Sequence, residues 1–290
     1  MAVFTERASN VSESRLQSAN MKPGKGRPLG VLAVMLLVYA GWAASQQAPA
    51  NNGRTPVILE LFTSEGCSSC PPADALLARL DKTQPIPGVE IIALKEHVDY
   101  WDHSGWKDRF SSAQFTARQS DYGQAFGNVT IYTPQMIVDG RTEFVGSAEG
   151  RARQAILQAA RAPKAVVQLE RSPRAAADAG EVSLRIRIGE LGGAAPGDRA
   201  EVFLAITESN LHSDVSRGEN AGRKLDHAGV VRVLRLIGAA NLGANPSFAA
   251  QPSVAIAPGW QRENLRAVVF VQERRRRRVL AAAAIAVPAE

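Results

Sequence analysis

The sequence has only two cysteines among its 290 residues, Cys67 and Cys70, and this scarcity excludes two classes of protein. A scaffold held together by several disulfides needs more cysteines, and so does a zinc site with four cysteine ligands. The sequence also lacks a Walker-type or dinucleotide-binding glycine motif, and no serine hydrolase or glycosidase constellation is visible. Any thiol chemistry of this protein must therefore come from the one Cys-x-x-Cys pair.

A broad basic surface is also absent. The formal net charge is +6, but five positive charges come from one run of arginines at 274–278, and the rest of the chain is nearly balanced. We therefore expect no nucleic-acid partner. The arginine run is interpreted as a solvated hairpin tip, with a groove-binding or membrane-surface role as the alternative.

The N-terminal apolar run, residues 29–40, is short for a membrane span of about 20 residues. Basic residues precede it and small residues follow it, a pattern typical of a secretory signal peptide. We expect residues 1–45 to be a polar tail plus signal peptide, with Met21 as an alternative start, and residues 46–55 to be a linker. An uncleaved membrane anchor is the alternative, and membrane contact is expected only in that case. Export to the periplasm or medium would place the thiol pair in an oxidising compartment.

Around the cysteines the apolar pattern changes from that of a strand to that of a helix. Residues 57–62 form an apolar run typical of a buried strand, and a turn with Gly66 follows. Downstream apolar residues then recur at the spacing of one helix face: Ala73, Leu76, Leu77 and Leu80. A thiol pair at the start of such a helix indicates redox chemistry, because the helix N-terminus stabilises a thiolate.

Further elements complete an α/β pattern up to residue 162. Residues 89–95 form a second apolar strand, expected to lie parallel to the first. A helix is expected at 108–126, a hairpin is expected to turn through Asp139 and Gly140, and a helix with Ser147 as N-cap is expected at 147–162.

From residue 163 onward the pattern is one of short strands and turns. Seven strands are expected, at 165–171, 181–188, 200–208, 230–237, 253–256, 265–272 and 279–286. The connection at 209–229 is long and is expected to be functional or mobile; its Arg223 and His227 are interpreted as structural, with a site role as the alternative. We therefore expect an α/β domain at 56–162 followed by an all-β, sandwich-like domain at 163–290.

A polar and aromatic segment at 97–107 follows the second strand, where functional loops of α/β sheets lie. His97, Trp101 and Trp106 are candidates for substrate contact there, together with Asp99, Asp102 and His103. The alternative is a structural role, as a packed aromatic loop. A third interpretation is a metal site made of Cys67, Cys70, His97 and His103, since thiolates and histidine suit Cu(I) or Zn(II).

Four segments resemble a bacterial family of secreted thioredoxin-like proteins, catalogued as a domain of unknown function (number twelve twenty-three). They are ELFTSEGCSSCPPAD at 60–74, HVDYWDHSGWKDRFSS at 97–112, YTPQMIVDG at 132–140 and GENAGRKLDHAGVVR at 218–232. The resemblance implies a thioredoxin-like fold for residues 56–162 and a β-rich domain after it. It also implies a cis-proline at Pro134, with Thr133 offering backbone hydrogen bonds to substrate.

The chemistry of the pair follows from its order along the helix. Cys67 is expected to be the nucleophile and Cys70 the resolving thiol. Asp74, on the same helix face, is a candidate to accept a proton from Cys70; alternatively it only complements the helix dipole.

We therefore expect a secreted or periplasmic thiol–disulfide oxidoreductase whose only cofactor is the redox-active disulfide. Its partners would be a protein or small-molecule thiol or disulfide and an envelope redox partner that recycles the pair. A copper- or haem-handling module of the envelope is the alternative, and an adhesion or assembly protein with an idle thiol pair is a third.

Overall fold

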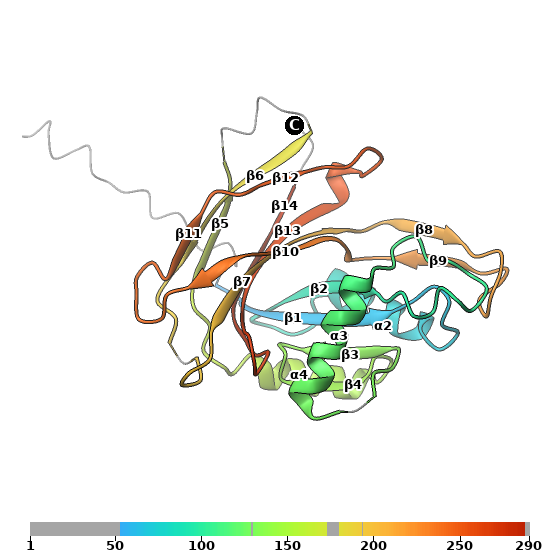
Figure 1. The fold of residues 1–290 in the computed structure, drawn as a ribbon, viewed down its shortest axis with the longest axis horizontal. Coiled ribbons are helices and arrows are strands. Elements are labelled where there is room, and N and C mark those ends of the chain that lie inside the picture. Colours follow the sequence, from blue (N-terminus) through green and yellow to red (C-terminus); the bar gives the residue numbers. More distant parts are fainter. Residues whose placement is uncertain (1–52, 129, 173–179, 193, 288–290) are drawn as a thin grey trace, which may run out of the picture. The chain divides into compact units, whose positions relative to one another are not determined.

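The computed structural model describes residues 53–128, 130–172, 180–192 and 194–287 (Figure 1). The expected tail and signal peptide, residues 1–45, lie outside these described residues. No helix within the described ranges is long and apolar enough to cross a membrane.

The fold is a mixed α/β structure dominated by one large sheet. Its eight strands lie in the order β14–β13–β7–β10–β2–β1–β3–β4. Their bounds are β1 Thr55–Thr63, β2 Val89–His97, β3 Gln135–Val138, β4 Thr142–Val145, β7 Ala200–Glu208, β10 Val230–Ala240, β13 Leu265–Glu273 and β14 Val279–Ala286. A second sheet contains β5 Val167–Arg171, β6 Glu181–Ile188, β11 Phe248–Ala250 and β12 Ser253–Ala255, and a separate hairpin contains β8 Leu211–Asp214 and β9 Lys224–His227.

Three helices cover the β1–β4 part of the large sheet. Helices α2 (Pro71–Thr83) and α4 (Glu149–Ala159) pack on the face that carries Val57, Leu59 and Leu61 of β1. Helix α3 (Ala113–Phe126) packs on the opposite face, against Ile58 and Phe62. The two faces follow from the alternation of side chains along a strand. β1 and β2 are parallel, as expected, and β3 and β4 form the expected hairpin.

Local sequence explains where the helices begin. Pro71 and Pro72 occupy the first turn of α2, where backbone N–H groups have no helical partner. α3 begins five residues later than expected, because the side chain of Ser112 caps it by accepting a hydrogen bond from the Gln114 N–H. The expected cap at Ser147 is wrong: α4 begins at Glu149, and Ala148 takes the N-cap position without a side-chain bond.

The two sheets face each other across the hydrophobic core of the C-terminal half. Inward-facing residues of β5 and β6 pack there against residues of β7, β13 and β14. Each of the seven expected strands is present, with ends shifted by up to three residues. The connection at 209–229 is not structureless, as β8 and β9 pair within it.

Both expected domains contribute to the same sheet. Strand β10 joins β2 through the pair Val230 and Lys95, and the Lys95 N–H donates to the Gly229 carbonyl at 2.7 Å. Gly229 has φ of 65°, and a Cβ there would lie 3.1 Å from the Ala93 carbonyl oxygen, so the junction requires glycine. The described residues between 53 and 287 all fall within one compact unit.

Candidate functional site

The two cysteines form a disulfide where β1 passes into α2. Cys67 lies in the turn after β1, Cys70 is the N-cap residue of α2, and their Cα atoms are 5.5 Å apart. Both cysteines are fully buried, although Ser68 and Ser69 between them are exposed. The Ser69 hydroxyl lies 3.3 Å from the Cys67 sulfur.

The loop between β8 and β9 is hydrogen-bonded to the turn that carries this disulfide. The amide of Asn220 donates to the Glu65 carbonyl at 2.8 Å and to the Cys67 carbonyl at 2.9 Å. The carboxylate of Glu219 accepts a hydrogen bond from the Ser68 N–H at 3.0 Å. Asn220 is itself fully buried. The loop is thus tied to the cysteine turn by three hydrogen bonds.

A buried polar network lies beside the disulfide. The carboxylate of Asp74 is 3.2 Å from the Lys95 ammonium, which donates to Nδ1 of His227 at 2.8 Å. Nε2 of His227 faces Oε1 of Glu65 at 3.1 Å. Because an ammonium only donates, His227 accepts at Nδ1 and carries its proton on Nε2. Four side chains from β1–α2, β2 and β9 thus form a chain of charges and hydrogen bonds out of contact with water.

Burial and neighbouring groups shift the pKa values of His227 and Glu65 in the directions that favour neutral His227 and ionised Glu65. Burial lowers the pKa of His227 and outweighs its hydrogen bond to Glu65, and the nearby positive charge of Lys95 lowers it further. Burial favours the neutral acid of Glu65, but the indole N–H of Trp106 and the nearby polar groups of His227 and Ser213 outweigh burial, so the pKa of Glu65 is lowered.

His97 is fixed by Asp108. Its Nδ1 lies 2.6 Å from Oδ2 of Asp108, an oxygen that also accepts the Glu65 N–H at 2.8 Å. Although burial opposes ionisation, interaction with His97 and two backbone N–H groups lowers the pKa of Asp108 to about 2. The imidazole of His97 packs against the His227 imidazole and the Phe110 ring. Its ring centroid is 5.3 Å from the centroid of each. Nε2 of His97 has no hydrogen-bond partner among the described residues.

The other expected contact residues lie around the same turn. Trp106 donates from its indole nitrogen to Glu65 at 2.7 Å, and Trp101 donates to the Thr133 hydroxyl at 2.7 Å. The peptide bond between Thr133 and Pro134 is cis, as expected. A Cβ on Gly66, the residue before Cys67, would lie 3.3 Å from the Trp101 carbonyl oxygen. Trp101 thus lies against both the cysteine turn and the Thr133–Pro134 step.

The alternative metal set receives no geometric support. Cys67 and Cys70 are bonded to each other, His97 is engaged with Asp108, and His103 is exposed. Nowhere in the described ranges do three or more histidine, cysteine or acidic side chains gather as metal ligands.

Sequence reasoning did not identify Glu65, Lys95 or Asn220 as site residues. Lys95 carried a usable signal, because a lysine inside a buried strand requires a charged or polar partner. His227, for which the sequence favours a structural role with a site role as the alternative, lies in the network. Arg223, given the same alternative, is exposed. Asn220 lies more than 150 residues from the backbone groups it binds, and no local pattern marks such a contact.

Known proteins share the fold of this chain, and one family model matches its sequence. A crystal structure of a protein from Agrobacterium tumefaciens is similar to this chain, with a TM-score of 0.60 and 22% identity over 81% of this chain and 95% of that one. A domain of the outer membrane lipoprotein Omp28 from Porphyromonas gingivalis matches at a TM-score of 0.27, with 16% identity over 43% of this chain and 88% of the domain. No curated protein matches. The family model described as "Protein of unknown function (DUF1223)" matches residues 58–272, so the chain belongs to that family.

Proposed function

We propose that this protein is an exported, thioredoxin-like thiol–disulfide oxidoreductase whose redox centre is Cys67–Cys70. The observation that carries the proposal is the place of the disulfide. The chain's only two cysteines are bonded at the N-terminus of a helix that follows a buried parallel strand, beside a buried carboxylate. A bridge across four residues closes so small a loop that it adds little to stability through chain entropy, which favours a chemical role.

The arrangement of residues 56–162 supports the thioredoxin-like interpretation. The element order is strand, helix, strand, helix, hairpin, helix, and the strands lie in the order β4–β3–β1–β2 with helices on both faces. The cis peptide bond before Pro134 agrees with the resemblance that suggested it.

The reaction would proceed in two exchanges once the pair is reduced. The Cys67 thiolate attacks one sulfur of a substrate disulfide, the substrate S–S bond breaks, and the departing sulfur leaves as a thiolate that takes up a proton. Cys70 then loses its proton and attacks the Cys67 sulfur. The mixed disulfide breaks, the second substrate sulfur leaves as a thiolate that takes up a proton, the Cys67–Cys70 bond forms again, and two electrons have passed to the substrate. An envelope redox partner restores the dithiol, and the reverse sequence oxidises client thiols.

Asp74 is suited to accept the proton of Cys70. It lies one helical turn after Cys70, is 8% exposed, and is held as a partner of the Lys95 ammonium. When the carboxylate takes up a proton, Lys95 remains bonded to His227, so its positive charge keeps a polar partner. Thr133, Trp101 and Trp106 would then form the walls against which substrate lies.

A trapped intermediate tests this proposal. The variant Cys70→Ser, reduced and mixed with a disulfide-containing peptide, is expected to accumulate a mixed disulfide at Cys67, because no second thiol resolves it. Cys67→Ser is the matched control and is expected to trap little. Both species are resolved by mass spectrometry under non-reducing conditions. Equal trapping by the two variants, or none by either, would contradict the assignment of Cys67 as nucleophile.

A further inference from the structure

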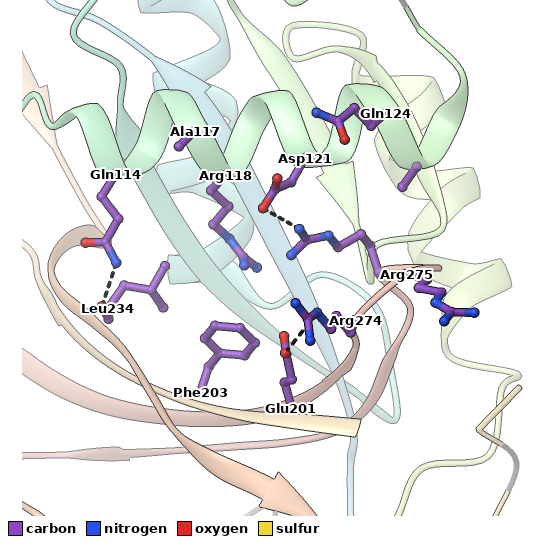
Figure 2. Close-up of a pocket in the computed structure, with 12 residues that line it drawn as sticks. Gln114, Ala117, Arg118, Asp121, Gln124, Glu201, Phe203, Leu234, Arg274 and Arg275 are labelled. Carbon is purple, nitrogen blue, oxygen red and sulfur yellow. Dashed lines mark hydrogen bonds and ion pairs between the residues drawn. The ribbon is translucent and has the colours of Figure 1, made fainter. Parts of the chain in front are cut away.

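The arginine run at 274–278 forms the turn between β13 and β14, as expected, and Arg274, Arg275 and Arg276 are exposed. The turn between β13 and β14 brings Arg274, Arg275 and Arg277 to the wall of a cavity of about 690 Å³. The remaining wall consists of α3 and strands β7 and β10 (Figure 2). None of the lining residues belongs to β1, α2 or the β8–β9 loop, so this cavity is separate from the disulfide site.

The walls of the cavity differ in chemistry. Phe203 of β7 and Leu234 of β10 give it an apolar side, and the guanidinium of Arg118 lies 5.3 Å from the centre of the Phe203 ring. Figure 2 shows Arg118 reaching from α3 toward Phe203, with Arg274 and Arg275 on the side opposite Leu234. A ligand in this space would meet an aromatic surface at one end and guanidinium groups at the other.

Most of the arginines are compensated by nearby carboxylates. Arg118 binds the Glu60 carboxylate at 2.6 Å behind the cavity wall, and Arg277 pairs with Asp121. Arg118 also lies 3.4 Å from Glu96, whose pKa burial raises well above its usual range.

The compensation is incomplete at one end of the cavity. Arg274 faces Glu201 only at 3.6 Å, and Arg275 makes no ion pair with a described residue. The carboxylate of Asp198 accepts hydrogen bonds from the backbone N–H groups of Arg275 and Arg276, and the nearby charge of Arg275 helps to lower the pKa of Asp198. The end formed by Arg274 and Arg275 therefore carries positive charge that an anion would complete.

We propose that this cavity binds a small organic anion, with a flat apolar body against Phe203 and a phosphate or carboxylate between Arg274 and Arg275. The volume lies within the roughly 300–1,000 Å³ typical of small-molecule sites. Arginine suits the anionic group because its planar fork donates two parallel hydrogen bonds to a phosphate or carboxylate. The arginine beside the Phe203 ring suits a flat apolar group, which stacks on guanidinium and aromatic faces alike.

Calorimetric titration of the full oxidised chain with 1-naphthyl phosphate tests the proposal. Inorganic phosphate and 1-naphthol, each carrying one half of the probe, are titrated in parallel at the same ionic strength. We expect 1-naphthyl phosphate to bind at least tenfold more tightly than either half. Arg275→Gln is expected to weaken its binding about tenfold or more, the loss typical of one hydrogen bond to a charged group.

Arg276→Gln is the matched control, because Arg276 belongs to the same run, is exposed and does not line the cavity. It removes the same formal charge and is expected to change the affinity less than twofold. No binding of 1-naphthyl phosphate at millimolar concentration would overturn the proposal. Equal weakening by both variants would also overturn it, since binding would then follow net charge. Inorganic phosphate binding as tightly as the aromatic ester would refute the organic ligand class.

Discussion

At the scale of single residues, the site depends on charges that the fold holds away from water. Lys95 is 1% exposed and Asp74 is 8% exposed, so each charge relies on the other and on His227. Removing one partner of a buried ion pair leaves an uncompensated charge, which typically costs about 3–5 kcal/mol. Replacing both partners with apolar side chains costs much less.

We therefore expect Asp74→Leu to lower the free energy of unfolding by about 3 kcal/mol, while Asp74→Leu combined with Lys95→Met recovers most of that loss. Urea unfolding of the oxidised protein at pH 7 measures both. A double variant no more stable than the single one would show that Lys95 does not depend on Asp74 for its charge.

His227 makes stability depend on pH. Its pKa is lowered in the folded protein by burial and by Lys95, so the unfolded chain takes up a proton more readily. The stabilisation from neutral His227 is present above the unfolded pKa of about 6.5 and is lost as the pH falls through the lowered pKa. We expect the urea midpoint to fall between pH 8 and pH 5, and His227→Gln to reduce that fall. The exposed His103 supplies a control, His103→Gln, which should leave the pH dependence unchanged.

At the scale of elements, we infer that the β8–β9 loop limits access to the disulfide, because it is bonded to the turn that carries the two buried cysteines. Asn220 contributes two hydrogen bonds to the cysteine turn, each with a net value of about 1 kcal/mol. Asn220→Ala is therefore expected to make opening of the loop, and reduction of Cys67–Cys70 by dithiothreitol, roughly tenfold or more faster. Alkylation of the released thiols at timed intervals measures the rate.

The control for this experiment is Arg217→Ala, in the same loop but exposed to solvent. Its reduction rate should match that of the unaltered protein. If Asn220→Ala is reduced no faster than Arg217→Ala, the loop does not limit access to the sulfur atoms.

Elements with a strong local period could be predicted from the sequence, whereas contacts between distant segments could not. The spacing of apolar residues predicts the buried face of α2, and the Asp-Gly pair predicts the turn at 139–140. β8 and β9 are four residues each and rich in polar residues, so no period marks them. The junction of β10 with β2 rests on one residue pair, Val230 and Lys95, 135 positions apart. The sequence therefore indicated the thiol pair and its helix, but not the loop and the charges around them.

At the scale of the whole molecule, the two halves depend on each other. A core shared by both packs Ile92 and Leu94 of β2 and Phe115 of α3 against Val231 of β10 and Phe270 of β13. A chain ending at residue 163 would expose these apolar side chains and lose the β10 neighbour of β2.

We therefore expect a fragment of residues 53–163 to be unfolded or aggregated, whereas residues 53–287 fold. Amide proton dispersion in NMR spectra of the two chains distinguishes these states. A well-dispersed spectrum from the shorter fragment would show that the first half is an independent domain.

The reduction potential of Cys67–Cys70 tests the central claim most directly. The protein is equilibrated in dithiothreitol or glutathione buffers of stepped ratio, quenched with an alkylating agent, and its oxidised fraction is measured by mass. We expect one reversible two-electron transition between about −270 and −120 mV, the range of catalytic thiol–disulfide pairs. A disulfide that stays oxidised below about −300 mV would behave as a structural bridge and would contradict the proposed redox function.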